Sequence, residues 1–154
     1  MFDRIKTRLS ADEGFTLIEL LVVIVILGIL VAIAVPSYLS LRGNAQQAAA
    51  QSNVRSAIPA AEEYYQQQSP TSYSGLKNAT LAAIAPGISP HVLGATNAAN
   101  DGYCLADTED GGTNYAWYTG GNGGKSTVSY GTKAQMDAAG ACDKTVYTSG
   151  DTIP

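Results

Sequence analysis

The chain has 154 residues and a net charge of -4 at pH 7. This acidic balance does not provide the basic surface on which nonspecific nucleic-acid binding relies, so we expect no direct nucleic-acid binding. The single histidine, His91, lies in a Ser-Pro-His context without a matched nucleophile and acid. We therefore expect His91 on the surface, no enzyme activity, and no bound cofactor or metal ion.

Residues 1–14 carry three basic and three acidic side chains. These are Asp3, Arg4, Lys6, Arg8, Asp12 and Glu13. Such a segment does not cross a membrane readily, and the positive-inside bias predicts that it stays in the cytoplasm. The opposite end of the chain is then expected outside the cytoplasmic membrane.

An unbroken apolar run extends from Phe15 to Val35, and its only polar residues are Thr16 and Glu19. A helix of this length covers about 30 Å, the hydrocarbon thickness of a bilayer, so residues 15–35 are predicted to span a membrane. An acid inside such a helix costs about 3 kcal/mol on insertion scales. The helix dipole offsets part of that cost, because Glu19 lies one turn from the helix start. We expect a cationic partner to supply the rest.

Two simpler interpretations of the apolar run remain open. The first is a plain membrane anchor that tolerates an acid near the lipid headgroups. The second is a secretory signal peptide cut at Ala32-Ile33-Ala34, although the helical pattern continues beyond that site.

The segment from Gly14 to Arg42, GFTLIELLVVIVILGILVAIAVPSYLSLR, resembles the amino-terminal region of type IV prepilins and the related pseudopilins. The resemblance implies that a prepilin peptidase and methyltransferase removes residues 1–14 by cutting between Gly14 and Phe15, and methylates the new amino terminus on Phe15. It also implies that the apolar helix is kept, first as an anchor and later as the filament core. One departure is that acidic Asp12 and Glu13 precede the cut, where many members carry basic residues.

Charge explains why processing and assembly would be linked. Cleavage after Gly14 converts an amide into an α-amine, which is protonated at neutral pH, one turn from Glu19. Between staggered subunits, Glu19 of one copy can lie beside Phe15 of an assembled neighbour. In a dry helical bundle this pairing sets the register, because any other stagger leaves a buried charge unpaired. The expected partners are other pilin subunits and the assembly machinery of the inner membrane.

Beyond Val35 the helix is predicted to continue to residue 68 with a kink. Pro36 cannot donate a hydrogen bond to Ala32, and Gly28 weakens the same stretch. The resemblance implies that the segment from Gly28 to Pro36 can loosen on assembly, and the alternative is a static bend. Pro59 is expected to bend the helix again.

The second half of the helix carries an apolar stripe on which a domain is expected to pack. Its members recur at helical spacing and are Ala50, Val54, Ile58, Ala61 and Tyr65. Polar residues, including Arg55 and Glu62, are expected on the other faces. The Ser69-Pro70 pair predicts the end near Gln68.

Residues 69–154 form the predicted head. Strand patterns cover 102–107, 114–119 and 126–130, with a fourth short strand near 144–148 and glycine-rich loops between them. Residues 76–93 are expected to connect these elements, with a short helix from Asn78 to Ala85. The predicted fold is α+β: a long kinked amino-terminal helix packed on one face of a small antiparallel sheet of three to four strands.

The head contains the chain's only two cysteines, Cys104 and Cys142. Their location beyond the membrane permits oxidation, so a disulfide is favoured over two free thiols or a metal pair. Closing this loop could contribute about 4 kcal/mol in the chain-entropy model. In the resembled family, a carboxy-terminal disulfide bounds a surface region that varies between members and often has an adhesive character.

Two weaker motifs have ordinary explanations. The acidic run 107–111 could bind calcium, but it lacks the alternating acids of a known loop and fits a solvated hairpin better. The sequence Asn78-Ala79-Thr80 satisfies a glycosylation sequon, which short sequences meet often by chance.

The predicted function is that of a structural subunit of an extracellular type IV pilus, which serves adhesion, twitching motility or DNA uptake. The chain would be a single-pass protein of the cytoplasmic membrane before assembly and extracellular afterwards. The main alternative is a pseudopilin of a type II secretion system. A third is a membrane-anchored binding domain that never polymerises.

Overall fold

The computed structural model describes residues 15–108, 113–142 and 147–151. The chain divides into two compact units, residues 1–41 and residues 42–154. The predicted leader, residues 1–14, lies outside the described residues. The proposed cleavage after Gly14 therefore stays a prediction.

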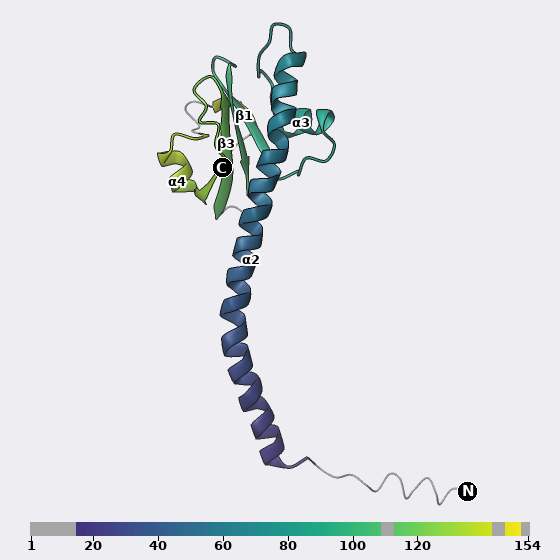
Figure 1. Ribbon diagram of the computed structural model, residues 1–154, viewed down its shortest axis with the longest axis vertical. Coiled ribbons are helices and arrows are strands. Elements are labelled where there is room, and N and C mark those ends of the chain that lie inside the picture. Colours follow the sequence, from purple (N-terminus) through teal and green to yellow (C-terminus); the bar gives the residue numbers. More distant parts are fainter. Residues whose placement is uncertain (1–14, 109–112, 143–146, 152–154) are drawn as a thin grey trace, which may run out of the picture. The chain divides into compact units, whose positions relative to one another are not determined.

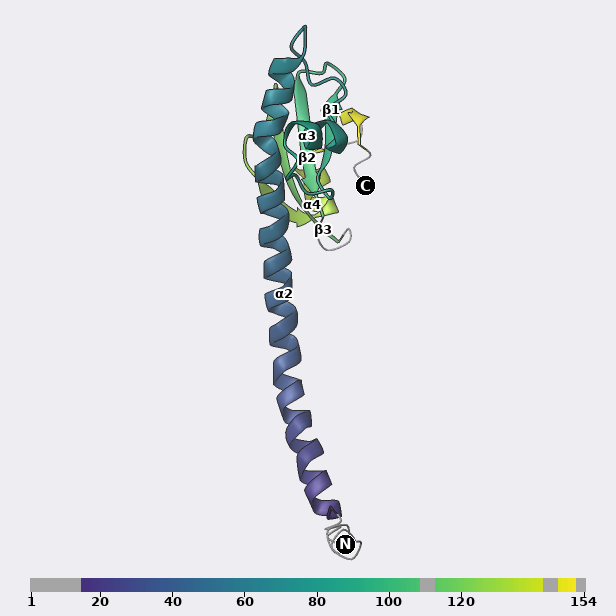
Figure 2. The ribbon, with the colours of Figure 1, turned by 90° about the vertical axis from the view of Figure 1, so that its right-hand side faces the viewer.

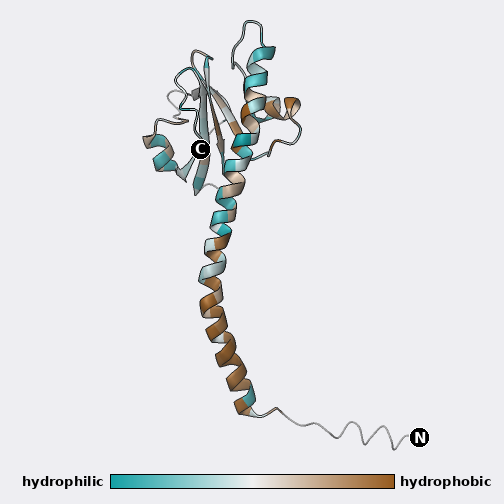
Figure 3. Ribbon diagram, in the orientation of Figure 1, coloured by the Kyte–Doolittle hydropathy of each residue, from teal (hydrophilic) through white to brown (hydrophobic). Residues whose placement is uncertain are grey.

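The described part of the first unit is the beginning of helix α2, which runs from Leu17 to Gln67. Every residue from 15 to 41 is exposed, and the hydropathy colouring of this stretch is mostly brown, with a teal patch near the start of the helix (Figure 3). Among the described residues, α2 is the one helix that is long and apolar enough to cross a membrane. An apolar surface of this extent on a single chain marks a contact with lipid or with other chains.

Helix α2 continues through all the positions where a break was considered. Gly28, Pro36 and Pro59 all lie within its helical residues. Next to Pro36, the Ser37 hydroxyl donates a hydrogen bond of 3.3 Å to the Ile33 carbonyl. The stretch from Gly28 to Pro36 is thus helical in this single chain, and its kinking or loosening on assembly stays a prediction.

The second unit combines the rest of α2 with a five-stranded antiparallel sheet in the order β4-β3-β2-β1-β5. Figure 1 shows the sheet beside this part of α2. The strands are β1 (Leu93–Asn97), β2 (Gly102–Asp107), β3 (Asn114–Gly121), β4 (Ser129–Thr132) and β5 (Tyr147–Gly150). The α+β fold is confirmed. Strands β1 to β4 form a meander, and β5 returns to pair with β1.

The sheet has one more strand than the largest number predicted. The additional strand is β1, whose sequence LGATN lacks the β-branched and aromatic alternation that indicates a strand. It forms because β2 and β5 pair with it on both sides. Strands β4 and β5 were predicted, and both lie two to three residues later than expected.

One face of the sheet packs on α2 through small side chains. Ala50, Val54 and Ala57 are buried against the sheet residues Tyr103 and Leu105. Two further buried helix residues are Ala60 and Ala61, whereas Ile58 and Tyr65 of the predicted stripe are only partly buried. Helix α3 (Asn78–Ile84), predicted for this stretch, adds Leu81 to the same core. Figure 2 shows α3 beside α2.

The other face of the sheet is covered as well, which the sequence did not predict. All six residues of β2 are buried. On this second face lies helix α4 (Lys133–Ala138), which begins with a capping box between Thr132 and Gln135. The hydrophobic core on this second face consists of Ala95, Cys104, Ala106, Tyr115, Trp117, Met136, Ala141 and Cys142. The sequence analysis made no prediction for this second face, because a helix of six residues gives too short a pattern to recognise.

Strands β2 and β3 meet at a close contact between a tyrosine and a glycine. Tyr103 pairs with Gly120, and a Cβ atom at Gly120 would overlap the Tyr103 ring. We expect Gly120→Ala to destabilise the head by about 1–3 kcal/mol, because the buried ring has no room to shift. Chemical denaturation would measure this. Gly87→Ala is the control, since nothing lies within 4 Å of its Cβ position. Equal stability of both variants would contradict the expectation.

Candidate assembly site

The start of α2 is closed by reciprocal hydrogen bonds between Thr16 and Glu19. The Thr16 hydroxyl oxygen accepts from the Glu19 amide at 3.3 Å, and the Glu19 carboxylate accepts from the Thr16 amide at 2.8 Å. The Thr16 hydroxyl also donates to the same carboxylate at 2.7 Å. This arrangement is a capping box, in which a threonine and a glutamate three residues later satisfy otherwise unpaired helix donors.

The capping box gives Glu19 a partner that the sequence interpretation missed. The signal was present, because threonine followed by glutamate at the third position is the capping-box pattern. Both donors are neutral, so they satisfy acceptor positions of the carboxylate without cancelling its charge. The two bonds end on Oε2, and Oε1 makes no hydrogen bond with any residue that the structure describes. A cation is still needed for charge compensation in an apolar surrounding.

Apolar side chains lie beside Glu19 on the exposed surface of the helix. Phe15, Ile18, Val22 and Val23 border an open groove beside Glu19. Phe15 is 82% exposed, so the residue predicted to carry the new amino terminus is accessible in the single chain. The site therefore combines a preorganised acid, an apolar rim and an exposed neighbour. These features suit contact with a second apolar helix that brings a positive charge.

A second glutamate, Glu62, connects α2 to the head. Its carboxylate accepts hydrogen bonds from the hydroxyls of Tyr103, at 2.7 Å, and Tyr73, at 2.9 Å. The rings of Tyr65, Tyr73 and Tyr103 lie in succession with centroids 4.6 Å apart. Glu62 is exposed, as expected for a residue outside the apolar stripe, but its hydrogen bonds to the head were not predicted. Helical periodicity places a residue on a face, but it does not show that two buried tyrosines require an acceptor there.

The tyrosine contacts make the head sensitive to alkali. Burial, followed by the hydrogen bonds to Glu62, raises the pKa of both Tyr103 and Tyr73. Unfolded tyrosines lose their protons at about pH 10, whereas these two retain them in the folded state. The free energy of unfolding should therefore fall as the pH rises above about 10, by at most about 1.4 kcal/mol per pH unit for each retained proton.

Denaturant titrations between neutral and alkaline pH would measure this loss. The double variant Tyr73→Phe with Tyr103→Phe should show a shallower fall than the unmodified chain. An equal slope in both proteins would contradict the assignment of the effect to these two hydroxyls.

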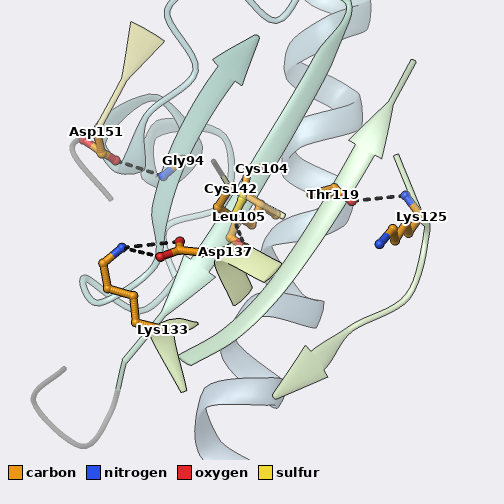
Figure 4. The surroundings of a disulfide bond; sticks show 9 residues. All are labelled: Gly94, Cys104, Leu105, Thr119, Lys125, Lys133, Asp137, Cys142 and Asp151. Carbon is orange, nitrogen blue, oxygen red and sulfur yellow. Dashed lines mark hydrogen bonds and ion pairs between the residues drawn. A yellow bond between two sulfur atoms is a disulfide. The ribbon is translucent and has the colours of Figure 1, made fainter. Parts of the chain in front are cut away.

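Cys104 and Cys142 form a disulfide within the core of the second face (Figure 4). Their Cα atoms are 5.3 Å apart, and the bridge spans a sequence separation of 38 residues. Both residues are buried. The predicted bridge is confirmed. It connects the central strand β2 to the segment that follows α4.

The weaker motifs do not form sites in the described residues. Asp107 is buried, and its Oδ2 accepts from the Asn53 amide of α2 at 2.7 Å. Residues 109–111 of the acidic run lie outside the described residues. The Asn78 side-chain amide donates to the carbonyls of Ser89 and Val92, so the sequon nitrogen is engaged in the folded head. His91 is exposed, as predicted. No group of three or more metal-ligating side chains occurs in the described ranges.

The fold and the site define a protein with an exposed apolar amino-terminal helix and a disulfide-bonded α+β head. Residues 9–35 match the family model of the prokaryotic N-terminal methylation motif. The type IV major pilin protein PilA of Myxococcus xanthus is 35% identical over 57 residues, which are 37% of this chain and 26% of that protein. The type IV narrow pilus major component PilA5 of Thermus thermophilus is 67% identical over 36 residues, 23% of this chain and 31% of that protein.

A fimbrial protein of Pseudomonas aeruginosa is 46% identical over 54 residues, which are 35% of each chain. The amino-terminal segment of this chain is similar to that of type IV pilins, which confirms the resemblance noted from the sequence. The matches span between 26% and 35% of the length of these relatives. No solved structure matches the chain.

Proposed function

We propose that this protein is a structural, noncatalytic subunit of an extracellular type IV pilus. The observation that carries the proposal is the start of α2, where an accessible apolar helix bears one preorganised carboxylate, Glu19, and matches a methylation motif and pilin relatives. A helix that served only as an anchor would have no use for this acid. A subunit that must find one register among apolar helices would use it.

Processing supplies the missing charge in this proposal. Removal of residues 1–14 by a prepilin peptidase leaves an N-methylated α-amine on Phe15, and this amine is a cation. Within one subunit, the capping box already holds Glu19 by neutral donors. The cation of a neighbouring subunit then compensates the charge of the carboxylate when the two helices pack. The uncleaved precursor lacks that cation, so cleavage permits assembly.

The same features suggest the route of the protein. The leader stays in the cytoplasm, α2 crosses the cytoplasmic membrane, and the head folds outside, where its disulfide forms. The assembly machinery of the inner membrane then moves the subunit into the fibre. There, other copies replace lipid around residues 15–41, and the head becomes the surface available for adhesion, motility or DNA uptake.

Mass spectrometry of sheared surface filaments tests the proposal. We expect this chain to be abundant there and to begin at methylated Phe15, with Cys104 and Cys142 oxidised. A mature protein that begins at another residue would contradict the processing step. A protein that begins at Phe15 but occurs only in the cell envelope would instead support the pseudopilin of a type II secretion system.

A further inference from the structure

A hydrogen-bonded joint connects two loops at one end of the sheet. The Asp101 carboxylate accepts from the side-chain amides of Asn122, at 2.8 Å, and Asn97, at 2.7 Å. The backbone repeats the connection, because the Asn122 amide donates to the Asp101 carbonyl at 2.8 Å. The turn between β1 and β2 is thereby attached to the loop that follows β3.

Asn122 stands directly before Gly123, and this is the only Asn-Gly pair in the chain. Both residues are exposed, and they occupy the centre of a turn closed by a 3.1 Å hydrogen bond from the Gly124 amide to the Gly121 carbonyl. Gly123 has φ of +79°, and nothing lies within 4 Å of its Cβ position. Its own amide makes no hydrogen bond with another described residue. The Gly123 nitrogen is therefore free to approach the Asn122 side chain.

We propose that Asn122 is a site of spontaneous deamidation that loosens this joint as the protein ages. The backbone nitrogen of Gly123 loses its proton and attacks Cγ of Asn122, which forms a cyclic imide and releases the side-chain nitrogen as ammonia. Water then opens the imide and leaves either an aspartate or an isoaspartate. No oxidant, metal or enzyme is needed, and water is the only co-reactant.

The product reverses the electrostatics of the joint. In the unmodified protein, the hydrogen bonds from Asn122 and Asn97 lower the pKa of Asp101, which keeps the carboxylate ionised. Deamidation removes the first of these donors and places a second carboxylate against Asp101. Two like charges at hydrogen-bonding distance repel each other, so the two loops should separate. The change adds a negative charge to the exposed end of the sheet.

Incubation of the purified full-length protein in detergent at mildly alkaline pH, followed by peptide mapping, tests the site. We expect Asn122 to be converted before any other asparagine, with both isomeric products present. Asn122→Gln is the matched control, because glutamine keeps an amide but closes the imide ring far more slowly. Conversion of Asn97 or Asn53 ahead of Asn122, or an intact Asn122 after the others have reacted, would overturn the proposal.

A second set of variants tests the effect on the joint without depending on the reaction rate. Asn122→Asp should lower the melting temperature and speed hydrogen exchange in residues 97–101. Adding Asp101→Asn should restore most of that loss, because the amide and the carboxylate have then exchanged places. Unchanged exchange and melting temperature in Asn122→Asp would overturn the loosening. None of these measurements requires a filament, so their outcome is separate from that of the proposed pilus function.

Discussion

Glu19→Ala should insert into the membrane as well as the unmodified protein and yet form no fibres. Insertion should even improve by up to about 3 kcal/mol, because the only acid in the apolar run is gone. Assembly should fail because no carboxylate remains to pair with the amine of Phe15 and to set the register of the helices. Membrane fractionation and electron microscopy of sheared filaments would measure the two effects separately.

Three further variants separate the contribution of hydrogen bonding at Glu19 from that of its charge. Glu19→Gln keeps the acceptor of the capping box but has no charge, and we expect it to lose fibres like Glu19→Ala. Thr16→Val removes the cap and keeps the charge, so it should reduce fibre yield without abolishing it. Thr16→Ser restores the hydroxyl and should recover the yield. Normal fibres from Glu19→Gln would show that charge compensation is not the basis of assembly.

Removal of the disulfide should produce the largest loss of stability in the head. The double variant Cys104→Ala with Cys142→Ala avoids a stray thiol and opens the loop that the bridge closes. In the chain-entropy model, a loop of this size contributes about 4 kcal/mol. The variant also removes two buried sulfur atoms from the core under α4. Denaturant unfolding of the oxidised protein and of the double variant would measure the difference.

The exposed ion pair between Lys133 and Asp137 provides the control for this experiment. The distance from Lys133 Nζ to Asp137 Oδ2 is 3.2 Å, and both side chains are more than 40% exposed. Lys133→Ala should therefore change stability by no more than about 1 kcal/mol, although it lies on the same side of the sheet. Figure 4 shows both features together. If the double cysteine variant were as stable as Lys133→Ala, the disulfide would not be a main source of the stability of the head.

The prediction from sequence succeeded where a local pattern carried the information. The apolar run identified α2, because a run from Phe15 to Val35 with only two polar residues has few structural solutions. Aromatic and glycine-rich alternation located β2 and β3. The two cysteines were paired correctly, since a chain with one pair leaves a single connectivity. The α+β arrangement then followed from one long amphipathic half-helix and several strands that had to share its apolar stripe.

The prediction from sequence failed where the structure depends on contacts between residues that are distant in the chain. Strand β1 has no strong pattern of its own and forms between β2 and β5. Glu62 was placed outside the apolar stripe, and its contact with the head was not predicted, because it depends on two tyrosines that lie 11 and 41 residues later in the chain. The second covered face of the sheet escaped notice because α4 has only six residues.

The candidate assembly site could be predicted from local sequence, whereas the shape of the head could not. The chemistry of Glu19 follows from local order alone, since an acid one turn inside an apolar helix must be compensated wherever that helix lies. The role of Thr16 could also have been predicted from the sequence, because Thr16 and Glu19 have the spacing of a capping box. The shape of the head required the three-dimensional structure, because its core is assembled from small and aromatic side chains. These residues acquire a partner only after the chain has folded back on itself.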